Sequence, residues 1–301
     1  MHLSINDLDA LCKIAISAAY EAGAIIRGHS NLQVAVQSKQ GGDSHASQVV
    51  TEVDFMCQDI ILKSLLPTCE KFDLALLSEE KPDDGSRLDK DYFWCIDPLD
   101  GTLSFIDQLP GYAVSIALVS RSGVPQIGVI YDPVENTLYH AIIGQGACRN
   151  EQPWPLTFSK DKNKTPLTVV CDRSFVQHRY YKEVINELEN VATEIGYDGV
   201  KQIPFGGAVM NACLVLENNP ACYFKFPKPL QGGGSFWDFS ATVCLFAEIG
   251  ASVSDIYGND LDLNREGSSF MNQQGVIYAS TQQLTDWVRE IYKRVSKPEK
   301  H

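Results

Sequence analysis

The sequence predicts a layered mixed α/β fold. Some segments carry apolar residues at three- and four-residue steps, which is typical of amphipathic helices, and others are short, β-branched and bounded by glycine or proline, which is typical of strands. Helices and strands follow one another without strict alternation, and this favours layers over a regular parallel sheet. With 301 residues and 44% hydrophobic content, the chain can form a sizeable core.

The first part of the chain is expected to be helical. A helix is predicted over residues 5–28, followed by a mobile polar loop over 38–47. A second helix is expected to begin at Thr51, with Asp54 in its first turn, and to end at Pro67.

The remaining elements follow from the same two patterns. Strands are predicted over residues 74–77, 93–96, 112–119, 126–131, 137–143, 167–171 and 275–279. Helices are predicted over residues 181–195, 206–216 and 236–250, and a last helix is expected to open with the capping box Ser280-x-x-Gln283. The polar segment 149–166 is the expected boundary between an N-terminal half, residues 1–155, and a C-terminal half, residues 156–301.

Charge and composition exclude several classes of protein. The net charge of −13 argues against a binder of nucleic-acid polymers or of membrane surfaces, because both partners are anionic. No signal-like start or apolar run of about eighteen residues occurs, so we expect a soluble, cytoplasmic protein. The nine cysteines form no Cys-x-x-Cys pair, and we expect them to be reduced and mostly buried.

Acidic side chains occur where strands are predicted to end. Asp97 and Asp100 follow one predicted strand, Glu79 follows another, and Asp238 lies in the first turn of a predicted helix. Buried carboxylates are costly unless they meet a cation or several hydrogen-bond donors, and Mg²⁺ prefers oxygen ligands. The sequence therefore predicts a magnesium site that handles phosphate, with Asp54 as a fifth candidate ligand.

The segment 97–102 offers more than carboxylates. If Gly101 and Thr102 open a helix, their N–H groups point at a phosphate, while Pro98 stiffens the turn and leaves the Leu99 carbonyl as a neutral ligand. Two metal ions about 4 Å apart would polarise the phosphate and lower the pKa of a bound water. An isolated Asp-x-x-Asp is more often a turn or a helix cap, so only the combination with the distant acidic residues favours a metal site.

Longer motifs resemble a known family. The segments Glu79–Glu80, Trp94–Thr102 and Trp237–Asp238 look like the signature of the inositol monophosphatase superfamily, which includes the CysQ-type 3'(2'),5'-bisphosphate nucleotidases. Thr51–Asp54 and Gly128–Tyr131 resemble further blocks of that family, so the likeness covers nearly the whole chain. It implies an α/β/α/β/α sandwich of the inositol monophosphatase and fructose-1,6-bisphosphatase type and a homodimer.

The resemblance also implies roles for individual residues. Two or three magnesium ions per site would be bound by Glu79, Asp97, the Leu99 carbonyl, Asp100 and Asp238. Thr102 would interact with Asp54 and, together with Glu79, would activate the attacking water. The substrate phosphate would be held by Gly101, Thr102, Gly207, Ala208 and Lys225, and the loop around Lys39 would close over the site.

The substrate stays open between two small phosphorylated metabolites. Lys225 stands where inositol monophosphatases carry a glutamate, and a lysine cannot accept protons from ring hydroxyls. Lys225 and Lys228 would suit the second phosphate of 3'-phosphoadenosine 5'-phosphate, whereas Asn211 resembles the inositol phosphatases, and a solvated surface lysine is the alternative interpretation of Lys225. A different class of function is a non-catalytic metal- or phosphate-binding relative with a regulatory role, which the complete set of expected ligands disfavours.

Overall fold

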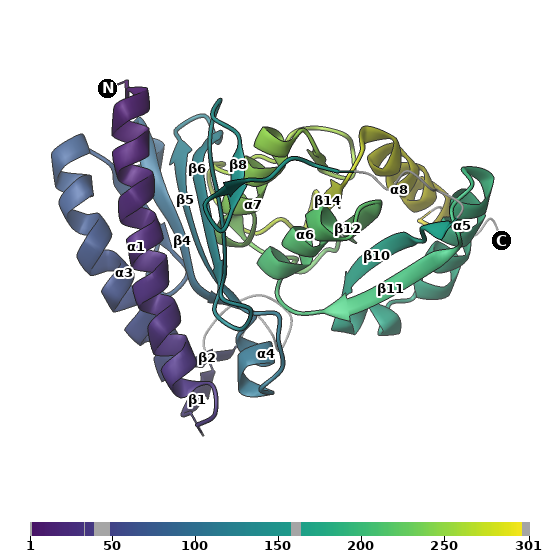
Figure 1. Cartoon of the computed structure of the whole chain (residues 1–301), viewed down its shortest axis with the longest axis horizontal. Coiled ribbons are helices and arrows are strands. Elements are labelled where there is room, and N and C mark those ends of the chain that lie inside the picture. The colour runs from purple at the N-terminus through teal and green to yellow at the C-terminus, as the bar shows by residue number, and fades with distance from the viewer. Residues whose placement is uncertain (1, 33, 39–48, 158–163, 297–301) are drawn as a thin grey trace.

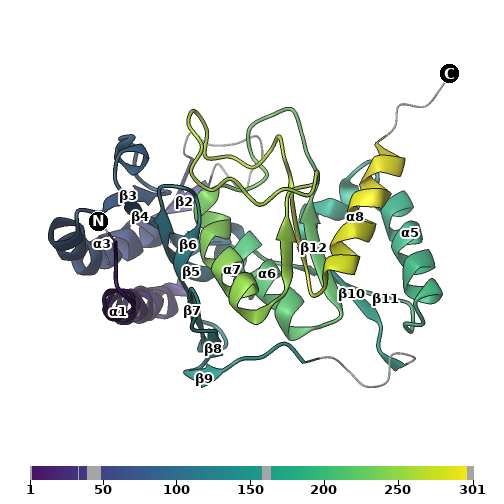
Figure 2. The same ribbon diagram turned by 90° about the horizontal axis from the view of Figure 1, so that it is seen from above.

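Helices and sheets alternate through the molecule in five layers (Figures 1 and 2). The computed structural model describes residues 2–32, 34–38, 49–157 and 164–296. The layers are, in order, α1 (Ile5–His29) with α3 (Glu52–Phe72), a seven-stranded sheet, α6 (Ala208–Glu217) with α7 (Phe236–Ile249), a five-stranded sheet, and α5 (Tyr181–Glu194) with α8 (Gln282–Val295). The predicted α/β/α/β/α sandwich is confirmed.

The two helices of the outer layer next to the N-terminus are both predicted, but the second is longer than expected. Ser4 caps α1, because its side chain accepts a hydrogen bond from the Asp7 N–H. Pro67 was expected to end the second helix, but it lies inside α3, which continues to Phe72. Thr68, the residue after Pro67, contacts β4: its hydroxyl accepts a hydrogen bond from the Trp94 Nε1–H over 2.9 Å. This buried contact offsets the backbone hydrogen bond that a proline lacks.

The first sheet has the strand order β3-β4-β5-β6-β7-β8-β9, and only β3 and β4 run parallel. Its strands are β3 (Ala75–Ser78), β4 (Tyr92–Asp100), β5 (Ala113–Ser120), β6 (Pro125–Asp132), β7 (Thr137–Ile142), β8 (Ala147–Arg149) and β9 (Gln152–Pro153). β4 extends through Asp100, so the acidic motif lies within the strand and not after it. Its pairing with β5 shifts register between Asp97 and Asp100, around Pro98, which cannot donate to the ladder.

The second sheet has the order β11-β10-β12-β14-β13, in which β10 runs parallel to both of its neighbours. Its strands are β10 (Leu167–Asp172), β11 (Val200–Phe205), β12 (Ala221–Lys225), β13 (Ser252–Ser254) and β14 (Val276–Ala279). The sequence analysis predicts no strand over β11, β12 or β13. β11 is a partly exposed edge strand that contains Pro204. β12 is buried along most of its length and shows no alternation, and β13 has only three residues.

Two local predictions differ from the structure. The cap of α8 is Thr281, whose side chain accepts from the Leu284 N–H, while the Ser280 hydroxyl accepts from the Ala221 N–H in the neighbouring strand. The prediction of a capping box at Ser280 is therefore wrong. Ser38, the first residue of the predicted loop, ends β1 (Val36–Ser38), which pairs with β2 (Val49–Thr51). The rest of that loop, with Lys39, lies outside the described residues.

The central helices join the two sheets. α7 packs on the first sheet so closely that a Cβ at Gly128 of β6 would lie 2.4 Å from the Ala241 carbonyl oxygen, and α6 packs on the second sheet. One buried cluster includes Phe93 of the first sheet and Tyr223 of the second. The division into residues 1–155 and 156–301 stays a prediction.

Most of the cysteines are buried, as expected. All nine cysteines are free thiols, and all except Cys69 and Cys148 are buried. Within the described ranges, no helix combines the length and the apolar composition needed to cross a membrane.

Candidate active site

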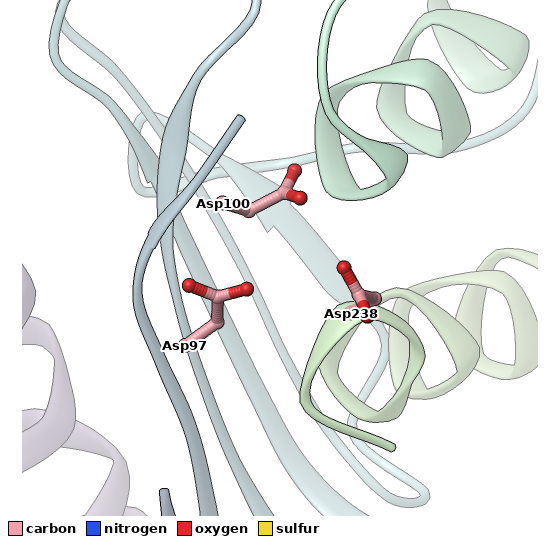
Figure 3. Close-up of side chains that lie close together, drawn as sticks. All are labelled: Asp97, Asp100 and Asp238. Atoms are coloured by element: carbon pink, nitrogen blue, oxygen red, sulfur yellow. The ribbon is translucent and has the colours of Figure 1, made fainter. Parts of the chain in front are cut away.

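Three carboxylates converge between the first sheet and the helix layer behind it. Asp97 and Asp100 project from β4, and Asp238 projects from the first turn of α7 (Figure 3). One oxygen atom of each residue lies within 4.8 Å of the others. The sequence separates Asp238 from β4 by more than a hundred residues, and α7 brings it back because that helix packs against β4, β5 and β6.

Glu79 borders this group. It directly follows β3, and its N–H donates to the Ile96 carbonyl of β4 over 3.1 Å, so its backbone lies beside Asp97. Its negative charge acts on both Asp100 and Asp238. The structure therefore brings the four acidic residues predicted as metal ligands to one end of the parallel strand pair.

The electrostatics of the group favour a cation. Burial, followed by the charge of Asp238, raises the pKa of Asp100 well above its usual value. Burial and the charge of Glu79 likewise raise the pKa of Asp238, to about 6. Like charges this close destabilise one another unless a cation or proton offsets them. Because all the donors are oxygen atoms, the residues present fit a hard divalent metal ion.

Asp100 is also held by the N-terminus of α6. Its carboxylate oxygens accept from the Ala208 N–H over 3.2 Å and from the Val209 N–H over 2.9 Å. The partial positive charge of a helix N-terminus stabilises an anion there. Ala208 was predicted to contact a phosphate, and in this structure its N–H contacts the Asp100 carboxylate.

Four glycines allow the N-terminus of α6 to lie this close to β4 and the segment after it. The Gly207 N–H donates to the Gly111 carbonyl over 2.7 Å, and a Cβ at Gly206 would lie 1.9 Å from the same oxygen. Gly101 has a φ of 84° and a Cβ there would lie 2.5 Å from that oxygen too. Nothing in the sequence marks Gly111 as part of the site, because the close contact of a loop glycine with the backbone of a distant segment cannot be predicted from neighbouring residues.

Thr102 and Asp54 meet as the family resemblance implies. The Thr102 hydroxyl lies 3.1 Å from Asp54 Oδ1 and 3.2 Å from the Leu99 carbonyl oxygen, and it donates towards both. The second Asp54 oxygen accepts from the N–H and the hydroxyl of Thr51, which caps α3. Gly101 precedes α4 (Thr102–Ile106), so the expected helix after the motif exists, although it has only five residues.

Lys225 has a partner that the sequence analysis did not identify. Its ammonium lies 2.6 Å from Asp172 Oδ2, and only 19% of its side chain is exposed, so it is not a solvated surface lysine. Burial lowers the pKa of Lys225, but the Asp172 carboxylate outweighs this and raises it overall. Asp172 directly follows the predicted strand 167–171, as Asp97 follows the predicted strand 93–96, and this shared position was the signal that could have found it.

Comparisons with known proteins agree with the fold. The family model described as the inositol monophosphatase family matches residues 7–297, so the chain belongs to that family. Membership supports a phosphatase with an acidic cluster that could bind a metal ion.

Particular relatives are similar over almost their full length. The Nus factor SuhB of Salmonella typhimurium is 30% identical over 93% of this chain and 98% of its own, and the inositol-1-monophosphatase of Synechocystis is 29% identical over 87% and 84%. Among solved structures, inositol monophosphatase from Anabaena has a TM-score of 0.68 at 25% identity, covering 96% of this chain and 97% of its own. The extragenic suppressor protein SuhB of Bartonella henselae has a TM-score of 0.71 at 23% identity, covering 95% and 99%, and this likeness concerns the fold.

Proposed function

We propose that this protein is a Mg²⁺-dependent phosphatase that hydrolyses a small anionic phosphate monoester. The observation that carries the proposal is the convergence of Asp97, Asp100 and Asp238 within 4.8 Å, with Glu79 beside them. Family membership supports the reaction class, and the oxygen-only donor set supports magnesium.

The proposed ligands are Glu79, Asp97, the Leu99 carbonyl, Asp100 and Asp238, holding two or three ions. Bound magnesium would offset the carboxylate charges and polarise the phosphate oxygens. Because Asp97 and Asp100 are buried, the positive charge of a bound ion would act on the phosphate more strongly than in water.

The other residues are proposed to hold the substrate and the attacking water. Asp54 fixes the Thr102 hydroxyl at the end of β4. Thr102 would help to orient a water for attack on phosphorus, and the Glu79 carboxylate would accept the proton of that water. The amides of Gly101 and Thr102 at the start of α4 would bind phosphate oxygens. Gly207 and Ala208 would form the side of the phosphate site next to Asp100.

Two substrates are proposed, inositol monophosphate and 3'-phosphoadenosine 5'-phosphate. The name of the Synechocystis relative supports the first. The position of Lys225 near the acidic cluster is the argument for the second, and the ion pair of Lys225 with Asp172 weakens that argument. Phosphate release from both compounds, with and without magnesium, tests the reaction class and the substrate together. The family also implies a homodimer, which analytical ultracentrifugation would test.

Asp97→Asn should abolish phosphate release while the fold stays intact. Amide and carboxylate have nearly the same shape, but the amide removes one negative charge from the proposed metal site, and we expect a loss of at least about 100-fold in kcat. The measurement is kcat on the better substrate, with circular dichroism as the check on folding. A folded Asp97→Asn protein with full activity would contradict the mechanism.

A second candidate is a regulatory role without hydrolysis. Relatives at 28–30% identity carry the name Nus factor, which supports a function beyond catalysis in that group. Magnesium binding without hydrolysis of any phosphate monoester in a broad panel would favour this candidate over the first.

A further inference from the structure

A second polar cluster lies at the edge of the five-stranded sheet. Asp172 ends β10 and Lys225 ends β12, and because these strands are parallel neighbours, both side chains lie at the same edge. The ion pair uses Asp172 Oδ2, while Asp172 Oδ1 accepts from the Tyr223 hydroxyl over 2.9 Å and from Asn211 Nδ2 over 3.0 Å. Three donors from two elements therefore fix the Asp172 carboxylate.

This cluster is connected to the candidate active site. Asn211 lies on α6, one turn after the Ala208 and Val209 amides that hold Asp100, and its Nδ2 also donates to the Gly206 carbonyl over 3.2 Å. The Lys225 charge acts on both Asp100 and Asp238. A group attached to a phosphate in the site would thus meet Lys225 and Asp172 together.

The pairing changes what Lys225 can recognise. An unpaired lysine beside a phosphate site would attract a second phosphate, but an ion pair carries no net charge. Arg173, which directly follows Asp172, also has a carboxylate partner, since its guanidinium lies 3.8 Å from Asp107. Lys225 and Arg173 therefore both have their positive charge paired with a carboxylate.

We propose that Asp172 is a specificity-determining residue: by neutralising Lys225, it disfavours substrates that carry a second phosphate. Asp172 would act through Lys225 and not on the reacting atoms. The proposal rests on the proposed phosphatase function and refines its choice of substrate.

The test compares matched ligands that differ by one phosphate. The pairs are adenosine 3'-phosphate with 3'-phosphoadenosine 5'-phosphate, and inositol 1-phosphate with inositol 1,4-bisphosphate, all in saturating magnesium. In Asp172→Asn, which keeps the side-chain shape and releases the lysine charge, the ratio of kcat/KM for bisphosphate over monophosphate should rise about 10-fold, mainly through KM. The double variant Asp172→Asn with Lys225→Met should lose this gain.

Two further variants keep the outcomes distinct. Asp73→Asn makes the same charge change at the surface pair with Lys90, before β3 and away from Glu79, and should leave the ratio unchanged. If Asp172→Asn does not fold, Lys225→Gln serves instead: it exposes the Asp172 charge, and the ratio should fall below that of the wild type. An unchanged ratio in a folded Asp172→Asn or Lys225→Gln protein would overturn the proposal.

Calorimetry separates this proposal from the proposed function. If the wild-type protein hydrolyses none of the four compounds, the phosphatase proposal fails, and the same ratio is then measured from dissociation constants. A rise in relative affinity for the bisphosphates in Asp172→Asn would support the role of Asp172 on its own. Equal relative affinities in both proteins would contradict it.

Discussion

The backbone at Gly207 lies against the Asp100 carboxylate. A Cβ at this position would lie 2.2 Å from Asp100 Oδ2, well inside van der Waals contact. The φ of Gly207 is −68°, which any residue can adopt, so the requirement here is space and not conformational freedom. At Gly101, whose φ is 84°, both requirements apply.

Gly207→Ala should therefore damage the site more than the fold. The methyl group would displace Asp100, and because catalysis depends on position within about 1 Å, we expect a fall of about 100-fold in kcat/KM. Phosphate release on the better substrate is the measurement.

The matched control is Gly28→Ala in α1, where a Cβ would have no neighbour within 4 Å. It should leave activity unchanged and stabilise the protein by up to about 1 kcal/mol, since alanine is the better helix former. Equal activity of the Gly207 and Gly28 variants would show that Asp100 tolerates displacement.

The start of α7 is fixed by two arginines from other segments. The guanidinium carbons of Arg87 and Arg265 lie 5.4 Å and 5.3 Å from the centre of the Phe236 ring, the first residue of α7. Arg87 also donates to Asp83, to Asn264 Oδ1 and to the Arg265 carbonyl. Since Asp238 follows Phe236 by two residues, these contacts also hold a proposed metal ligand in place.

Arg87→Met should lower the free energy of unfolding by about 3 kcal/mol, because it leaves buried acceptors without a donor. Arg87 is only 3% exposed. Urea denaturation with and without the substitution measures the loss.

Arg121→Met is the matched control at this scale. Arg121 pairs with Asp91, but both side chains are largely exposed, so its removal should cost less than about 1 kcal/mol. A similar small loss in Arg87→Met would mean that the buried contacts add little.

Across the whole molecule, the proposed metal ligands come from both sides of the interface between the first sheet and the helix layer. Asp97 and Asp100 belong to β4, and Asp238 belongs to α7. A cation that binds all three would link the two layers. The raised pKa values of Asp100 and Asp238 reflect the repulsion and burial that such a cation would relieve.

Magnesium should therefore stabilise the folded protein. A ligand at 100 times its dissociation constant adds about 2.7 kcal/mol, if it binds only the native state. Thermal unfolding should show a higher Tm in magnesium and a lower one after chelation, with little response in Asp238→Asn. A magnesium response that is the same in wild type and Asp238→Asn would place the metal elsewhere.

Local sequence patterns were sufficient for features that depend on near neighbours. α1 and α5 follow from apolar spacing, and the acids at positions 79, 97 and 100 stand out because carboxylates rarely adjoin buried strands without a role. The same reasoning failed at Pro67 and Ser280. In both cases a contact with a distant strand, to Trp94 or Ala221, outweighs the local preference.

By itself, the sequence determined the mixed α/β class and the candidate ligands, because periodicity and residue chemistry are local properties. Only the tertiary structure decided which of these groups meet. Lys225 pairs with Asp172, which lies 53 residues earlier, and Asp100 receives amides from residues 108 and 109 positions later. Such contacts depend on strand order and helix packing, which bring distant segments together, and they determine which charges lie side by side at the candidate site.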